Sequence, residues 1–379
     1  MVAPPYLKNQ QRSSLDVRPS DLDRDTSSSA TFSSRGTRVE PESNSWSVAT
    51  ESDPLLTAEV SARPQFDAFL QYGNSTMSYA TLQDGMKYFE AHGGYLAYDM
   101  CRGRPFVLSD PVAPVERYAE IVDAFLQLYP RACFCQVSRT MAEILSARGW
   151  YVNEMGCDME LHLPTYDFSG PKKSKLRQAA AKIEREHFTI EELSSEQVDT
   201  DEITRLCSTW RESKLNRHEL RFLVRPLVLD DETEVRKFYL RDPEGAIVSF
   251  VFFDPICEGG EVIGYSPAIK RRSPAAPTGA EEAVTKFAIE RFKSEGRRVL
   301  RLGLIPLFEV NDSEFRHRWL VKKIFQLLYK HGDGWVYSFK GHADFKRRYR
   351  GDLLKTYCAT SYRFDVMSLV GLLRLCRMI

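Results

Sequence analysis

The sequence has few of the features that mark membrane-spanning, secreted or nucleic-acid-coating proteins. Its 52 Lys and Arg balance 52 Asp and Glu, a formal net charge of +0, which argues against a surface coated with positive charge but leaves local basic patches open. No apolar run approaches the length that crosses a bilayer, and the first residues lack the apolar segment of a secretory signal. We therefore expect a cytoplasmic chain, or one held peripherally at the inner face of a membrane.

The chain also lacks the usual signatures of metal, nucleotide and nucleophilic sites. It has no P-loop and no convincing G-x-G-x-x-G, no Ser-His-Asp or Cys-His arrangement at a family-specific spacing, and seven histidines that lie apart. Of eight cysteines only Cys133 and Cys135 are close. Two thiols without further ligands at a suitable spacing do not make a zinc site, and they fit one face of a strand. We expect no metal and no cofactor.

The composition is that of a globular protein with room for two domains. Hydrophobic residues make up 43% and charged residues 27% of the 379 positions. Residues 1–62 differ, since they are rich in Ser, Asp, Arg and Pro. Such a stretch cannot bury enough surface to offset chain entropy, which predicts a disordered tail; a mis-assigned start codon is the alternative. We divide the remainder into domains at 63–166 and 167–362 and a C-terminal segment at 363–379.

Both larger segments alternate helices and strands. The first is predicted to have strands at 93–100, 103–112, 132–138 and 150–163, and helices at 115–130 and 139–149. The second is predicted to have helices at 172–188, 199–214, 280–295 and 316–332, and strands at 189–193, within 234–256 and at 298–307. This order predicts two copies of one α/β plan rather than one large sheet.

A cationic cluster stands out in "GYSPAIKRRSPAAPTG", residues 264–279. Lys270, Arg271 and Arg272 follow an apolar strand and precede a proline-rich turn and a helix. A solvated surface loop is one interpretation of three adjacent cations. An anion-binding site at the mouth of a cleft is the other.

Several motifs together resemble a known family. "KLRQAAAKIERE", "STWRESK", "RRSPAAPTG", "RLGLIPL" and "FKGHADFKRRY" occur in the order and spacing of the C-terminal catalytic domain of bacterial phosphatidylglycerol lysyltransferases and its freestanding relatives. The resemblance covers roughly residues 65–362. It implies an α/β (α+β) fold of two tandem GNAT-like acyltransferase domains with mixed, mostly antiparallel central sheets. It also implies an aminoacyl-tRNA donor and a lipid hydroxyl acceptor that meet in a tunnel between the domains.

Two departures from the family are visible. In full-length lysyltransferases, membrane helices before this domain act as a lipid flippase, whereas this chain resembles a synthase without the flippase. The family pattern "D-L-M-R" is replaced by "AIKR", with Ala268 where the acid is expected. An acid there would suit a cationic donor, so its absence puts lysine as the transferred residue in doubt. A neutral amino acid, or a different donor, is the alternative.

The resemblance assigns roles to the cationic cluster and its neighbours. In a GNAT-type fold the donor lies along a splayed central strand, and the following turn and helix N-terminus bind its phosphates. Arg271 or Lys340 could stabilise the oxyanion, and Tyr265 could relay a proton. Lys214, Trp210 and Arg272 are the substrate-binding candidates, with a core tryptophan and a snorkelling lysine as the alternative for the first two.

Two further basic stretches are candidates for charged tRNA. One is a predicted helix and the other interleaves cations with aromatic residues, a pattern that suits single-stranded nucleic acid. The tRNA-binding candidates in them are Lys172, Lys173, Lys175, Arg177, Lys346 and Arg347. Solvated basic surfaces are the alternative.

Three functions remain open on the sequence. The first is an aminoacyl-tRNA-dependent transferase that acts on a phosphatidylglycerol-like or other lipid hydroxyl. The second is a same-fold enzyme with a small metabolite or peptide amine as acceptor, or with an acyl-thioester donor. The third is a catalytically silent RNA- or membrane-binding module. The amphipathic segment 363–379 fits either a membrane interface or a helix docked on the protein's own core.

Overall fold

The computed structural model describes residues 63–214, 218–333, 337–361 and 366–378. The tail predicted at 1–62 lies outside these residues. Twelve strands occur in the described part of the chain: β1 Lys87–Ala91, β2 Gly94–Cys101, β3 Arg104–Leu108, β4 Cys133–Val137, β5 Tyr151–His162, β6 Thr189–Glu192, β7 Arg236–Arg241, β8 Ile247–Glu258, β9 Glu261–Arg272, β10 Val299–Arg301, β11 Ile305–Pro306 and β12 Asp352–Thr360.

The helices agree with the predicted pattern of amphipathic segments. The described α-helices are α1 Phe66–Tyr72, α2 Tyr118–Leu128, α3 Arg139–Ala147, α4 Ser174–Arg185, α5 Thr200–Glu212, α6 Ala280–Ser294, α7 Trp319–His331, α8 Phe339–Arg347 and α9 Val366–Leu375. Short 3-10 turns lie at η2 Tyr79–Leu82, η3 Val115–Arg117, η4 Pro171–Lys173 and η5 Ser195–Gln197.

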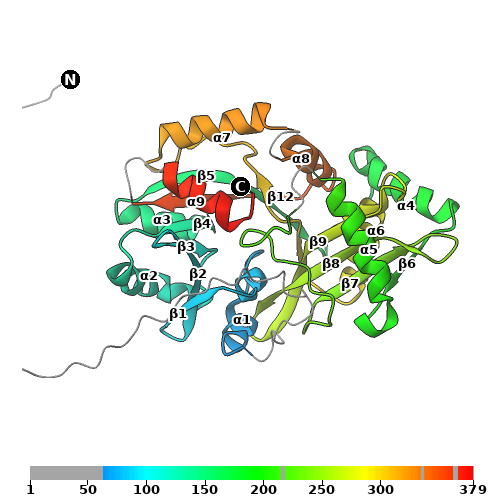
Figure 1. Cartoon of the computed structure of the whole chain (residues 1–379), viewed down its shortest axis with the longest axis horizontal. Helices are drawn as coiled ribbons and strands as arrows, with labels where there is room; N and C mark the ends of the chain where they lie inside the picture. The colour runs from blue at the N-terminus through cyan, green and yellow to red at the C-terminus, as the bar shows by residue number, and fades with distance from the viewer. Residues whose placement is uncertain (1–62, 215–217, 334–336, 362–365, 379) are drawn as a thin grey trace, which may run out of the picture. The chain divides into compact units, whose positions relative to one another are not determined.

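The strands form one continuous mixed sheet in the order β1-β2-β3-β4-β12-β5-β10-β9-β8-β7-β6, with β11 paired to β5 (Figure 1). Among the described strands, β3–β4 and β9–β10 pair in parallel and the other pairs are antiparallel. The α+β fold with a mixed, mostly antiparallel sheet is therefore confirmed. The expectation that the two halves would not share one large sheet is wrong.

The long strand β5 explains why the sheet is continuous. Its twelve residues pair with β12 along one edge, and the other edge pairs with β10 and β11. Strand β12 comes from the C-terminal end of the chain, yet it lies between β4 and β5. Each edge of a buried strand must satisfy its backbone N–H and C=O groups, so β5 joins the two halves through hydrogen bonds. The domain boundaries drawn from the sequence stay a prediction.

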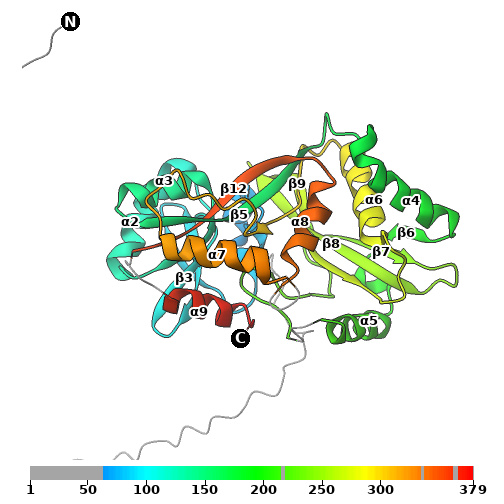
Figure 2. The same ribbon diagram turned by 90° about the horizontal axis from the view of Figure 1, so that it is seen from above.

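Helices cover both faces of the sheet. In the β6–β10 half, α6 packs on β7, β8 and β9 with α4 beside it, and α5 packs on the opposite face of β8 and β9 (Figure 2). In the other half, α2 and α3 cover one face, whereas α1, η2 and α9 contribute to the core on the other. The apolar side of α9 is docked there, since Leu372 and Leu375 pack in that core. Core docking is thus the interpretation that the structure supports for α9.

Strands β9 and β10 diverge after a short contact. They pair only at Val299↔Gly264 and Leu300↔Tyr265, and β9 then runs on to Arg272 alongside β8. Gly264 permits the contact, because a Cβ there would lie 2.0 Å from the carbonyl oxygen of Val299. The divergence leaves the stretch from Ala268 to Arg272 without β10 as a neighbour, and the cationic cluster of the sequence lies on this stretch.

Candidate active site at the splayed strand

Arg271, Trp210 and Lys214 lie together. The Arg271 guanidinium lies 3.8 Å from the centroid of the Trp210 ring, and the Lys214 ammonium lies 5.0 Å from it. Trp210 is near the end of α5, Lys214 follows that helix, and Arg271 is at the end of β9. Arginine over a tryptophan face is held by the ring quadrupole and by stacking. The structure thus brings three of the sequence-predicted site residues into one contact group.

Glu219 fixes the other side of Arg271. The guanidinium donates hydrogen bonds to Glu219 Oε1 at 2.5 Å and to the carbonyl oxygen of Lys270 at 3.1 Å. Only 8% of Arg271 is exposed. The Trp210 ring packs on the face of the guanidinium and the Glu219 carboxylate binds its edge, so Arg271 is held in one orientation. A group that stabilises a developing charge needs such preorganisation.

The segment that carries Glu219 is anchored by a buried ion cluster. Arg225 pairs with Asp254 at 2.7 Å and with Glu232 at 2.9 Å, and all three side chains are buried. Three residues before Arg225, Phe222 is fully buried, and its backbone exchanges two hydrogen bonds with Gln83. The stretch between α5 and β7 is therefore tied to both halves of the sheet, and Glu219 lies at its start.

Replacing Arg225 with alanine should destabilise the protein by about 3 kcal/mol or more, because it leaves two buried carboxylates without their cation. Thermal unfolding would measure the loss. Arg205 offers a matched control, since it is exposed and pairs with Asp199 at 3.8 Å. Arg205→Ala should change stability by well under about 1 kcal/mol. Equal melting temperatures for the two variants would contradict the anchoring role.

Two more lysines lie at the same end of β9, on the face of the sheet opposite Arg271. Lys270 of β9 lies 4.3 Å from the ring centroid of Phe345, and Lys346 of α8 is buried, with its Nζ donating to the carbonyl oxygen of Leu304 at 2.7 Å. Burial, and then the charge of Lys270, lower the pKa of Lys346 to about 7. Burial likewise lowers the pKa of Lys270. We call Lys214, Lys270, Arg271 and Lys346 the junction cluster.

His342 of α8 is exposed and lies within electrostatic range of three of these lysines. Desolvation, followed by the charges of Lys346, Lys270 and Lys214, lowers the pKa of His342 to about 3, so the imidazole is neutral at physiological pH. The ring stacks on Tyr337 with 4.7 Å between centroids. Neutral histidine beside three lysines leaves the junction cluster with an excess of positive charge, which suits an anionic or negatively polarised ligand.

Asp158 provides a carboxylate close to Lys346. It lies on β5, is buried, and accepts hydrogen bonds from Thr76 and from the backbone N–H of Met159. Burial raises the pKa of Asp158, and the charge of Lys346 opposes that rise. Gly303 lies beside both partners, because a Cβ there would be 3.4 Å from Lys346 Nζ and 4.0 Å from the Thr76 methyl. A side chain at Gly303 would therefore crowd the Lys346 ammonium.

A cavity of about 210 Å³ adjoins the cluster at the N-terminus of α6. Its lining consists of Arg272, Thr278, Gly279, Ala280, Glu281, Glu282, Gly341, Phe345 and Arg348. Gly279 has φ of 95°, a conformation that glycine adopts readily. The two glutamates pair with Arg272, at 3.6 Å, and with Arg348. The charges that line this cavity balance, so the excess of positive charge lies at the junction cluster and not in the cavity lining.

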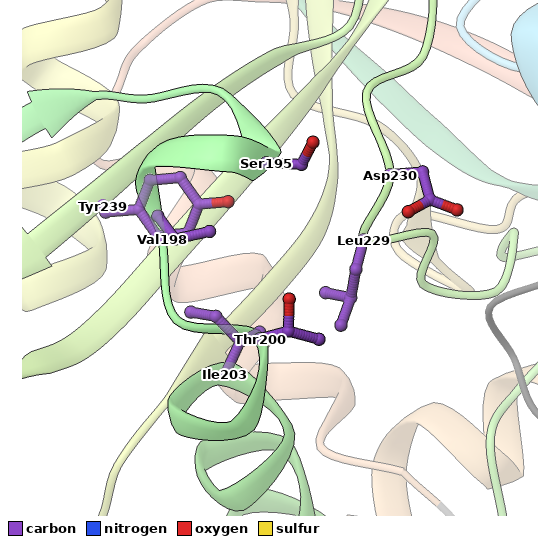
Figure 3. Close-up of a pocket in the computed structure, with 7 residues that line it drawn as sticks. All are labelled: Ser195, Val198, Thr200, Ile203, Leu229, Asp230 and Tyr239. Atoms are coloured by element: carbon purple, nitrogen blue, oxygen red, sulfur yellow. The ribbon is translucent and has the colours of Figure 1, made fainter.

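A second cavity is too small for a substrate. Ser195, Val198, Thr200, Ile203, Leu229, Asp230 and Tyr239 surround about 20 Å³ beneath the start of α5 (Figure 3). That volume is room for about one water molecule. It lies at the opposite end of α5 from Trp210 and Lys214.

Several predicted site residues lie elsewhere. Tyr265 is buried in the core with its ring stacked on Phe292 at 4.3 Å, and at about 3.3 Å per residue it lies about 20 Å along β9 from Arg271. Its hydroxyl therefore has no place as a proton relay beside that guanidinium. Lys340 is exposed, and its Nζ donates to the carbonyl oxygen of Lys330 at the end of α7.

The tRNA-binding candidates divide into surface and buried groups. Lys172, Lys175, Arg177 and Arg347 are exposed, whereas the Lys173 ammonium lies 3.8 Å from the Tyr166 ring centroid and bonds the Asp167 carbonyl oxygen. Arg177 donates to the carbonyl oxygens of Phe168 and Gly170. Lys346 is buried, so its ammonium is not offered on the surface to RNA phosphates.

Four participants were missed in the sequence: Lys270 as a member of the cluster, Glu219, His342 and Asp158. Lys270 was visible as part of three adjacent cations, but strand alternation favours only every second residue on one face. The ring of Phe345 supplies the contact that holds it. No local signal marks Glu219 or Asp158, since their partners lie 52 and 82 residues away.

Comparison with known proteins places the chain in a family. Residues 66–360 match the family model "Phosphatidylglycerol lysyltransferase, C-terminal". The chain belongs to this family. The match covers both halves of the sheet and every residue of the junction cluster, and the predicted membership and GNAT-like fold are confirmed.

Two relatives of this phosphatidylglycerol lysyltransferase C-terminal family member share about a quarter of its residues in the aligned region. A phosphatidylglycerol lysyltransferase of Bacillus subtilis is 25% identical over 294 residues, which are 76% of this chain and 33% of that protein. The lysylphosphatidylglycerol biosynthesis bifunctional protein LysX of Rhodococcus opacus is 23% identical, over 71% of this chain and 26% of its own length. The chain thus spans about a third or less of these relatives.

A solved structure shows the same fold. L-PGS from Bacillus licheniformis superposes with a TM-score of 0.68 at 19% identity, over 84% of this chain and 98% of that one. None of the helices described for this family member is long and apolar enough to cross a membrane. Within the same residues, no group of three or more His, Cys, Asp or Glu side chains has the geometry to hold a metal ion.

Proposed function

We propose that this chain transfers an aminoacyl group from an aminoacyl-tRNA to the hydroxyl of a lipid. The observation that carries the proposal is a group of cations at the end of the splayed strand β9, in a chain that belongs to the phosphatidylglycerol lysyltransferase C-terminal family. Lys214 and Arg271 lie on the α5 face, and Lys270 and Lys346 lie on the α8 face. Cations from three separate elements gather where a GNAT-like fold opens its central sheet. Such a site suits a donor that brings phosphates and an ester carbonyl.

The chemistry requires only one exchange of ester bonds. The acceptor hydroxyl oxygen attacks the carbonyl carbon of the aminoacyl ester, and a new C–O bond forms as the bond to the terminal ribose oxygen of the tRNA breaks. The proton of the acceptor hydroxyl passes to that ribose oxygen. A tetrahedral oxyanion forms in between, and stabilising it is the main task of the protein.

The residues divide this work between them. Arg271, held by Trp210 and Glu219, supplies directed N–H groups for the oxyanion. Lys346, with a pKa near 7, takes the proton of the acceptor as its neutral amine and returns it to the leaving oxygen as its ammonium. In this proposal Lys214 and Arg272 bind the phosphates of the tRNA 3′ end. The exposed cations Lys172 and Lys175 would contact the RNA farther out.

Transfer of label from charged tRNA into lipid tests the proposal. The purified chain would be mixed with tRNA charged with a labelled amino-acid mixture and with vesicles of total cell lipid. Label should enter the organic phase, and mass spectrometry should find lipids heavier by one aminoacyl group. Treating the charged tRNA with ribonuclease first should abolish the product. Labelling that survives this treatment, or label that stays in a water-soluble product, would contradict a lipid acceptor served by tRNA.

A further inference from the structure

The outer face of α7 carries an unusual combination of side chains. Trp319 is 70% exposed and Leu327 is 62% exposed, and Lys323 and Lys330 on the same face are exposed too. These residues are spaced at i, i+4, i+8 and i+11, which places them on one side of a helix. Figure 1 shows α7 at the margin of the fold, with the rest of the chain on its other side.

The inner face of α7 is already used. Val321, Ile324 and Leu328 pack against a small core that contains Phe325 of the same helix and Phe339 of α8. The core-packing residues of α7 are therefore on its inner face, and Trp319 and Leu327 are not among them. The exposed tryptophan and leucine need another explanation.

The charge of α7 has one sign. Its residues Trp319–His331 include Lys322, Lys323 and Lys330 and no Asp or Glu. Lys340 adds a cation at its C-terminal end, where its Nζ bonds the Lys330 carbonyl oxygen at 3.1 Å. A helix with Trp and Leu on its exposed face and lysines among them has the composition of an interfacial membrane helix. Lysines can extend to the headgroups while the tryptophan ring sits at their level.

We propose that the outer face of α7 docks on an anionic lipid bilayer. The lysines of α7 favour anionic headgroups by charge complementarity. The exposed Trp319 and Leu327 favour a surface into which apolar side chains can insert. RNA could pair its phosphates with the lysines, but unlike a bilayer it would not bury the side chain of Leu327. The choice also rests on the lipid acceptor of the proposed function. Helix α8, which carries Lys346, packs on the inner side of α7, so docking would hold the junction cluster next to the source of that acceptor.

Vesicle sedimentation tests the docking without any chemistry. The full chain should sediment with vesicles of phosphatidylcholine and phosphatidylglycerol, and much less with phosphatidylcholine alone. The double variant W319A/L327A should bind at least tenfold more weakly, and K323E/K330E should lose the preference for anionic vesicles. All four positions are exposed, so thermal unfolding should be unchanged. Lipids brominated in their acyl chains should quench the fluorescence of Trp319.

The matched controls lie on other exposed parts of the protein. Val115 and Leu128 are 52% and 64% exposed, and Lys87 and Arg102 are exposed cations, so V115A/L128A and K87E/R102E should bind vesicles as the parent does. Equal losses in controls and α7 variants, unchanged binding of W319A/L327A, or a loss of tRNA binding in place of vesicle binding would each overturn the proposal.

The outcome separates this proposal from the proposed function. If α7 docks, W319A/L327A should lose transfer to vesicle lipid but keep transfer to acceptor dispersed in detergent. If the chain binds vesicles through α7 yet moves no label from charged tRNA, the docking stands and the transferase reaction fails. If label is transferred to vesicle lipid equally by the parent and by W319A/L327A, the transferase reaction stands and the docking through α7 fails.

Discussion

Arg271→Ala should lower the rate of aminoacyl transfer by at least about a hundredfold, the usual effect of removing one oxyanion donor. The reason is geometric, since the guanidinium is held between the Trp210 ring and Glu219 and cannot be replaced by a neighbouring cation. Single-turnover transfer from charged tRNA would measure the loss. The fold should persist, because Glu219 keeps contact with solvent, with a quarter of its side chain exposed.

Two companion variants distinguish position from charge. Arg271→Lys retains the charge without the planar fork, so we expect a rate between those of the parent and the alanine variant. Glu219→Gln keeps the shape of the partner but weakens the hold on the guanidinium, and should slow transfer less than Arg271→Ala. Turnover of Arg271→Ala equal to that of the parent would return Lys270, Arg271 and Arg272 to a solvated surface stretch.

The fold was largely predictable because its elements are local. Residues close together in the sequence determine the apolar runs of β8 and β9, the amphipathic pattern of α2 and the alternation of helices and strands. The continuous sheet was not predictable in this way. It depends on β12 pairing with β4 and β5, which lie about two hundred residues earlier in the chain, and pairing at such a distance has no signal in a single sequence.

Site residues were predictable only where they belong to a recognisable sequence motif. Arg271, Trp210 and Lys214 were named because the motifs that hold them resemble the family, and the structure brings them together. Lys346 was found as a cation but given a surface role, since nothing in "FKGHADFKRRY" says which lysine faces inward. Its burial follows from the packing of α8 on β11, a contact between distant segments.

Lys346→Met should abolish most of the pH dependence of transfer together with most of the activity. In the parent the rate should rise with pH and level off above about pH 7, because the neutral amine is the form that accepts the proton of the acceptor and the pKa of Lys346 is lowered to about 7. A loss of about a hundredfold or more is typical when a general base is removed. A pH series of single-turnover rates would show both effects.

Lys346→Arg is the informative control for charge. It preserves a cation at the position but cannot release a proton near neutral pH, so it should be as slow as Lys346→Met if the amine is a base. If Lys346 only attracts anions, the arginine variant should instead keep substantial activity and the parent should lose activity as the pH rises past 7. The two roles therefore predict opposite slopes.

Stability supplies an independent readout of the same group. The folded-state pKa of Lys346 lies near 7, below the value of about 10.5 expected for an exposed lysine, so the folded chain binds this proton more weakly than the unfolded chain does. The group therefore costs stability, fully below pH 7, and the cost fades as the pH rises from 7 towards 10.5. Lys346→Met removes the cost and should melt at a higher temperature than the parent at pH 6, with the gap closing at pH 9. An inactive variant that is more stable than the parent in this pH-dependent way would separate a catalytic lysine from a structural one.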